Sequence, residues 1–113
     1  MTKHSLNLDL IFQALSDPTR RAFLARMANG PISVSALAEP TGFALPTVMK
    51  HLDILVSADL ITTEKNGRIR MCQARTETLA ATEGWLATQR ANWESQTDRL
   101  ESYLATLQKG RTP

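Results

Sequence analysis

Cysteine is almost missing from this sequence, since Cys72 is the only one. An intrachain disulfide is therefore excluded, and nothing points to an oxidising compartment. Histidine is also scarce, with His4 and His51 as its only occurrences. Zinc and softer metals prefer sets of Cys and His ligands, so we expect no metal site.

The sequence also lacks the patterns that carry enzyme chemistry. It has no glycine-rich phosphate loop and no serine in a nucleophile-elbow setting. A lone Cys72 would be a nucleophile only if a partner lowered its pKa, and a packed, inert strand cysteine is the simpler interpretation. We therefore expect no enzyme and no cofactor.

Long apolar runs are absent as well. None approaches the roughly 18 residues that cross a bilayer, and Lys3 and Asp9 interrupt the start of the chain where a signal segment would be apolar. We expect a cytoplasmic protein without membrane contact. The 113 residues, 42% hydrophobic and 21% charged, are typical of one globular domain spanning 1–113.

The net charge of +2 is small but unevenly distributed along the chain. Residues 1–76 hold the basic excess, and four basic residues without an acid fall between 65 and 76: Lys65, Arg68, Arg70 and Arg75. Such a cluster can follow a phosphate backbone, although a charge run is more often a solvated face.

Apolar periodicity and punctuation predict four helices in the first half of the chain. Asp17 followed by Pro18 is an N-terminal helix signal, and Ser33 is a second N-cap. The segment from Pro40 to Gly42 ends a short third helix, and a fourth follows from 45 to 58. Leu8, Ile11, Phe12 and Leu15 fall on one stripe of the first helix. The residues expected to face the core are Phe23, Leu24 and Met27 in the second helix, and Leu45, Val48, Leu52, Leu55 and Val56 in the fourth.

A hairpin and a long helix complete the predicted order. Residues 60–65 and 68–74 are strand-like, and Asn66-Gly67 between them is a strong two-residue turn signal. Residues 77–108 contain no proline, which predicts one long helix or a kinked pair. A seam of apolar residues spaced by sevens runs along it: Leu79, Leu86, Trp93, Leu100 and Leu107.

This order predicts a mainly α fold with a small two-stranded β-wing. A short helix, a tight turn and a second helix make a helix-turn-helix at about 33–58, and the basic hairpin at about 60–75 makes it the winged type. Two interpretations of the helix at about 77–108 are open, a lid on its own domain or a dimerisation element. We favour a homodimer through the first and last helices, with an interface that includes Leu8, Ile11, Leu86, Trp93 and Leu100.

A winged helix-turn-helix predicts double-stranded DNA as the partner. Recognition helices contact base edges from their N-terminal turns, which favours Thr47 and Lys50, with His51 on the flank. In the wing the candidates are Lys65, Arg68 and Arg70, the two arginines being two apart on one expected strand. The alternative for Thr47 and Lys50 is that they are ordinary surface residues, and the alternative for the wing charges is that they only protect a strand edge.

Three stretches in order resemble ArsR-type winged-helix repressors. They are residues 14–21 (ALSDPTRR), 34–38 (VSALA) and 45–52 (LPTVMKHL), followed by Gly67-Arg68 in the wing. The resemblance covers about residues 10–105. It implies a homodimer joined by its first and last helices that binds an imperfect palindrome in operator DNA and represses transcription.

The departures from the family are informative. Metal-sensing members have a Cys-Val-Cys motif where this chain has Ser33-Val34-Ser35, so the resemblance is to the metal-free branch. Ala44 precedes the recognition helix where members often have a capping serine, and Asp53 replaces a residue that is often basic.

The leading hypothesis is therefore a sequence-specific transcriptional regulator, most simply a repressor. One alternative is a winged-helix protein-interaction module with Met49 and Ile54 forming an apolar contact. Another is a regulator gated by a small molecule or by oxidation of Cys72. The sequence identifies no effector.

Overall fold

The structure, a computed structural model, describes residues 6–110, so that His4 lies outside the described part. It contains two compact units, one up to Ala80 and one from Ala81 onward. Among the described residues, no helix is both long enough and apolar enough to cross a bilayer.

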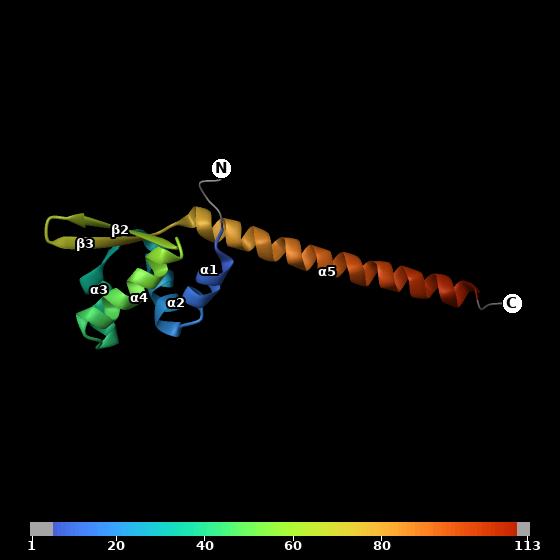
Figure 1. Ribbon diagram of the computed structural model, residues 1–113, viewed down its shortest axis with the longest axis horizontal. Coiled ribbons are helices and arrows are strands. Elements are labelled where there is room, and N and C mark those ends of the chain that lie inside the picture. The colour runs from blue at the N-terminus through green and yellow to red at the C-terminus, as the bar shows by residue number, and fades with distance from the viewer. Residues whose placement is uncertain (1–5, 111–113) are drawn as a thin grey trace. The chain divides into compact units, whose positions relative to one another are not determined.

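The predicted helices and hairpin follow one another in the predicted order in the first unit (Figure 1). Its helices are α1, α2, α3 and α4, with two 3-10 turns, η1 and η2, and its strands are β1, β2 and β3. The bounds are α1 Leu8–Leu15, α2 Pro18–Arg26, η1 Met27–Asn29, β1 Ile32–Ser33, α3 Val34–Ala38, η2 Glu39–Thr41, α4 Leu45–Ser57, β2 Ile61–Asn66 and β3 Ile69–Ala74; α5, Thr76–Gly110, begins in this unit.

Side-chain caps fix where three of the helices begin. The Asp17 carboxylate accepts from the backbone N–H of Arg20 at 3.1 Å, and the Ser33 hydroxyl accepts from the N–H of Ala36 at 3.1 Å, as the sequence predicted. Asn7 plays the same part for α1. Each cap satisfies an amide that the first helical turn leaves without an intrahelical partner.

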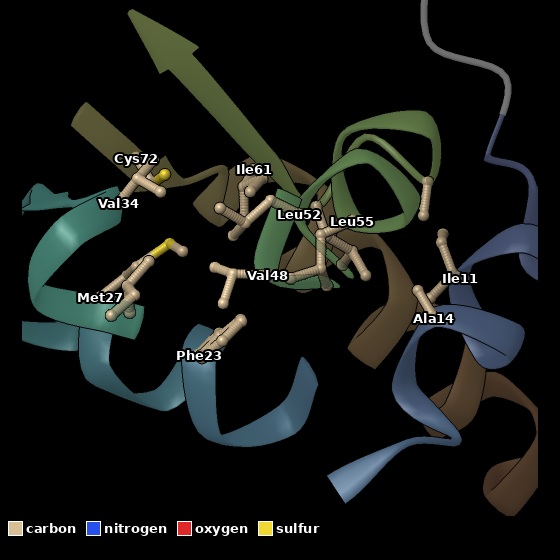
Figure 2. Close-up of a cluster of buried hydrophobic side chains, with 13 residues drawn as sticks. Ile11, Ala14, Phe23, Met27, Val34, Val48, Leu52, Leu55, Ile61 and Cys72 are labelled. Atoms are coloured by element: carbon tan, nitrogen blue, oxygen red, sulfur yellow. The ribbon is translucent and has the colours of Figure 1, made fainter. Parts of the chain in front are cut away.

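The core of the first unit is built around α4, which contacts α1, α2, α3 and β2. Val48, Leu52 and Leu55 of α4 are buried, and Figure 2 shows them within the cluster of apolar side chains. Leu45 and Val56 were expected in this stripe but are 57% and 40% exposed, because they lie at the margins of the buried face. The buried cluster comprises Ile11, Ala14, Phe23, Met27, Val34, Leu37, Val48, Leu52, Leu55, Ala58, Leu60, Ile61 and Cys72.

The sheet has three antiparallel strands in the order β1-β3-β2. The hairpin of β2 and β3 is the predicted wing, and β1 adds two residues that pair Ile32 with Cys72 and Ser33 with Met71. A strand of two residues carries no periodicity, so the sequence did not predict it.

The hairpin turn lies one residue later than expected. Asn66 ends β2 and pairs with Ile69, so Gly67 and Arg68 occupy the turn in place of Asn66 and Gly67. Gly67 has φ of 65° and is the one residue in the turn with positive φ. Glycine adopts this conformation at little cost, whereas the predicted turn would also have required it of Asn66.

The second unit is formed by α5 from Ala81 onward, where the helix continues without a break to Gly110. The prediction of one long helix is therefore confirmed, and the kinked alternative is wrong. Gly84 meets no neighbouring atom at the position of an added Cβ.

Candidate nucleic-acid interface

The turn between α3 and α4 is closed by Thr41 and Gly42. The Thr41 hydroxyl donates to the Ala38 carbonyl at 2.6 Å and accepts from the N–H of Phe43 at 3.0 Å. Gly42 has φ of 69°, a left-handed conformation that favours glycine. These local bonds set the geometry at which the chain leaves α3 and begins α4.

The N-terminal half of α4 presents Thr47 and Lys50 to solvent. Both side chains are exposed, while Val48 between them is fully buried. Asp53 lies one turn further along and is also exposed. No side chain caps α4 at Ala44, as expected from the missing serine. The base-contacting candidates are therefore accessible and stand on a helix whose other face is fixed in the core.

His51 is held differently from Thr47 and Lys50. Its side chain is 19% exposed, and its Nδ1 lies 3.1 Å from Nη1 of Arg20 and 3.8 Å from the carboxylate of Asp17. The ring meets Phe23 edge-on, with the two centroids 6.4 Å apart, and its centroid lies 6.2 Å from that of the tilted Phe43 ring. His51 is thus part of the junction between α2 and α4.

The wing presents a pair of basic side chains on one face. Lys65 of β2 stands directly opposite Arg70 of β3. Because side chains alternate along a strand, this pair shares the ribbon face of Ile61 and Cys72, which are buried in the core. Arg70 also donates to the Thr63 hydroxyl at 3.4 Å. Beyond the core, the inward face of the wing therefore becomes positively charged.

Arg68 lies in the turn, so the expectation that it shares a strand with Arg70 is wrong. The one-residue shift of the turn removes Arg68 from the regular alternation of β3. All three basic wing residues, Lys65, Arg68 and Arg70, are exposed.

A groove of about 530 Å³ lies between the recognition helix and the wing. Its lining combines apolar and basic side chains from α4 and β3, with the start of α3 as its third side. The residues concerned are Ser33, Val34, Ser35, Leu45, Met49, Arg68, Ile69, Arg70 and Met71. This groove was not predicted from the sequence: Leu45 was expected to face the core, whereas Leu45 and Ile69 are each 57% exposed.

Arg75, counted in the basic cluster, is engaged within the protein. Its Nη1 donates to Asp59 at 2.7 Å and its Nη2 to Glu77 at 3.3 Å. Asp59, which has φ of 62°, lies in the turn that follows α4, so its ion pair with Arg75 ties this turn to the base of the wing. The basic surface of the wing therefore comes from Lys65, Arg68 and Arg70.

The arginines of α2 also have internal partners. Arg20 is 9% exposed and donates to the carbonyls of Ala14 and Gln13 at the end of α1. Arg21 donates to the Leu15 carbonyl at 2.8 Å. These cations compensate carbonyls left free by the last turn of α1, which is a structural role.

The residues expected in a dimer interface are placed unequally. Ile11 is 1% exposed and belongs to the core of its own chain, which leaves no surface for a partner, whereas Leu8 is half-buried. On α5, Leu86, Trp93 and Leu100 are 48%, 70% and 58% exposed. Leu10 at 37% exposure is an additional apolar side chain on α1 that the spacing argument did not include.

The positions that could hold a metal or a reactive thiol are occupied structurally. Ser33 caps α3, and no cluster of three or more His, Cys, Asp or Glu side chains suited to a metal lies within residues 6–110. Cys72 is fully buried, and burial raises the pKa of its thiol although nearby Arg70 acts in the opposite direction.

Met49 and Ile54, the apolar contact expected of a protein-interaction module, are half-buried and pack against the core.

Comparisons with known proteins agree with this geometry. Residues 15–64 match a family described as a helix-turn-helix domain. The chain is 40% identical over 73 residues to the HTH-type transcriptional regulator Rv2034 of Mycobacterium tuberculosis, covering 65% of this chain and 68% of the relative. It is 30% identical over 76 residues to the transcriptional repressor SdpR of Bacillus subtilis, covering 67% and 84%.

Solved structures extend the similarity to the fold. A crystal structure of an ArsR family transcriptional regulator is 50% identical, with a TM-score of 0.73, and covers 77% of this chain and 96% of that one. An ArsR-like transcriptional regulator from Rhodococcus sp. RHA1 is 28% identical with a TM-score of 0.75, covering 84% and 90%. The chain therefore belongs to the ArsR family of winged helix-turn-helix transcriptional regulators.

Proposed function

We propose that this regulator binds double-stranded operator DNA in the cytoplasm as a homodimer and represses transcription from an imperfect palindrome. Residues 1–113 act as one winged helix-turn-helix domain, with α5 as its dimerisation segment. The relatives named above include a repressor, which supports repression over activation.

The observation that carries this proposal is the exposed N-terminal half of α4 beside the basic face of the wing. Thr47 and Lys50 point away from a core that holds Val48 in place. A helix of this kind fits the major groove of B-DNA, where hydroxyl and ammonium groups reach acceptors on base edges. Thr47 and Lys50 are therefore proposed to contact bases, and His51 contributes through its place in the helix junction.

The wing supplies backbone contacts in this proposal. Lys65 and Arg70 face the side of the ribbon on which the helices pack, and Arg68 lies at its tip. Cations at these positions reach phosphates, or the minor groove, beside the base pairs that α4 contacts. Asp53 would face the same DNA, and repulsion between its carboxylate and the phosphates lowers affinity.

Dimerisation through α1 and α5 follows from the exposed apolar seam of α5 and from Leu8 and Leu10 on α1. Exposed apolar side chains gathered along one stripe mark interaction surfaces. A two-fold axis between identical chains presents two recognition helices to two half-sites, which requires a palindromic operator.

The segment Ser33–Ser35 is proposed to be structural rather than a sensor. Its first hydroxyl accepts from the N–H of Ala36 and so caps α3. Ser35 lines the groove between α4 and the wing, where it is exposed to the same DNA surface. This assignment fits the metal-free branch of the family.

Selection of binding sites from genomic DNA with the purified protein tests the proposal. The expected result is a palindrome with half-sites about one helical turn, or roughly 10 base pairs, apart. If the protein shows no salt-dependent binding to any selected DNA at low ionic strength, the proposed function is wrong.

Two variants then separate base contacts from backbone contacts. Lys50→Ala should relax the selected sequence as well as weaken binding, whereas Arg68→Ala should weaken all sequences evenly and reduce the salt slope by about one per subunit. Ser57→Ala, at the exposed far end of α4, is the matched control and should change neither property.

A further inference from the structure

The guanidinium of Arg20 contacts two helices, α1 and α4, that are far apart in the sequence. Its Nε donates to the Ala14 carbonyl at 2.8 Å and its Nη2 to the Gln13 carbonyl at 3.1 Å, both at the end of α1. Its Nη1 faces Nδ1 of His51 on α4 at 3.1 Å. A buried cation is costly unless its donors are satisfied, and here all three directions of the guanidinium meet an acceptor.

The partner of Arg20 on α4 is equally constrained. Arginine can only donate, so the Arg20–His51 contact is a hydrogen bond in the tautomer whose Nδ1 accepts and whose proton lies on Nε2. The ring is also held by Phe23 on α2 and Phe43 before α4. Asp17, the N-cap of α2, completes the group at 3.8 Å from Nδ1.

We propose that Arg20 and His51 form a positioning link that sets the angle of the recognition helix against α1. Both are positioning residues, because they act on DNA through the placement of Thr47 and Lys50 rather than through phosphate contacts. The inference rests on the proposed function and adds to it, since α1 belongs to the proposed dimer interface. The link ties the spacing of the two recognition helices to the helix through which the chains pair.

Four variants give a direct test of the link. His51→Asn keeps an acceptor near the position of Nδ1, whereas His51→Leu leaves the Nη1 donor unsatisfied. Arg20→Lys keeps the charge but cannot reach both helices with one planar group. Arg26→Lys is the matched control, because Arg26 donates to the Ala36 and Leu37 carbonyls of α3 and makes no contact with His51.

Operator affinity should fall about tenfold in Arg20→Lys and in His51→Leu, and the double variant should be no weaker than either single one, because residues in contact are not additive. His51→Asn should retain most of the wild-type affinity. The salt slope should stay unchanged in every variant, since no phosphate contact is lost. Circular dichroism confirms that each variant is folded at the temperature of the assay.

Two outcomes overturn the inference. Additive losses in the double variant would show that Arg20 and His51 act independently, and a salt slope reduced by about one in Arg20→Lys would assign Arg20 to a phosphate. In the control double variant, Arg26→Lys with His51→Leu, the two losses of affinity should add, which shows that the double-mutant cycle detects independent residues. If the wild-type chain binds no operator, the proposed function fails, and the same cycle measured on the free energy of unfolding still tests the link.

Discussion

Lys65 stands directly opposite Arg70 in the antiparallel pair of β2 and β3, so that two cations share one face of the wing. Like charges placed opposite each other destabilise a hairpin. A pair that costs folding energy is better explained by an external anion than by solubility alone, since lysine on one strand would suffice to protect an edge.

Replacing either member of this pair should therefore separate binding from stability. Lys65→Ala and Arg70→Ala should each reduce the salt slope of operator binding by about one per subunit and leave the unfolding free energy unchanged or slightly higher. Glu64→Gln is the control, because Glu64 lies on the opposite face of the ribbon, paired with Met71. Filter binding over a range of salt measures the slope, and an unchanged slope in both alanine variants would contradict a role of the wing in binding phosphate.

Local signals predicted the elements of this fold well. The caps at Asp17 and Ser33 act within three residues of themselves, so the residue types alone indicate them. The hairpin was predicted from Asn66-Gly67, but the turn is Gly67-Arg68. Both dipeptides are compatible with a tight turn, and the choice depends on strand pairing, which places Thr63 opposite Cys72 in the core.

The internal partners of the arginines could not be predicted from the sequence. The partners of Arg20 lie between six and thirty-one residues away in the sequence, and those of Arg26 lie ten or eleven residues away. Arg75 binds the carboxylate of Asp59, which is sixteen residues away. No periodicity or spacing rule connects such pairs. The basic cluster at 65–76 therefore overstates the surface available to DNA, because Arg75 forms ion pairs within the protein.

Asp17 should make stability depend on pH at the acidic end. A hydrogen bond from the backbone N–H of Arg20 lowers the pKa of the Asp17 carboxyl below its ordinary value of 3.8. Burial acts in the opposite direction, and the charges of Arg20 and His51 lower the pKa further. A depressed pKa in the folded state means that the stabilisation is complete above the unfolded value and is lost as the pH falls through the folded one.

Asp17→Asn isolates this charge, since asparagine caps a helix about as well as aspartate. The variant should be less stable than the wild type at neutral pH, and the difference should shrink as the pH falls below about 4. Urea unfolding at a series of pH values measures it. Asp17→Ala, which also removes the cap, should remain less stable at every pH, and a constant difference for Asp17→Asn would show that its charge plays no part.

Cys72 should be chemically silent in the folded protein. Its side chain is fully buried and burial raises the pKa of the thiol, so the reactive thiolate is disfavoured at neutral pH. We expect alkylation by iodoacetamide to be slow in native buffer and to accelerate as denaturant opens the core. A thiol-specific oxidant should change the operator affinity of the wild type no more than that of Cys72→Ala, and release of operator only by the wild type would instead establish thiol gating.

The seam of α5 leads to a prediction about assembly. Leu100 is 58% exposed on a 35-residue helix, and it follows Leu86 and Trp93 at intervals of seven. Such a seam packs against another helix, so a charge within it should be desolvated on pairing and oppose it.

Leu100→Glu should therefore shift the protein toward monomer in sedimentation velocity and weaken operator binding. At a low concentration, where the wild type is also monomeric, the two proteins should have nearly the same free energy of unfolding. Ala105→Glu is the matched control, because it adds the same charge about half a turn away from the seam, at another exposed position. It should leave both the dimer and the operator affinity intact. If Leu100→Glu sediments as the wild type does, α5 does not pair through this seam, and the proposed dimer interface is wrong.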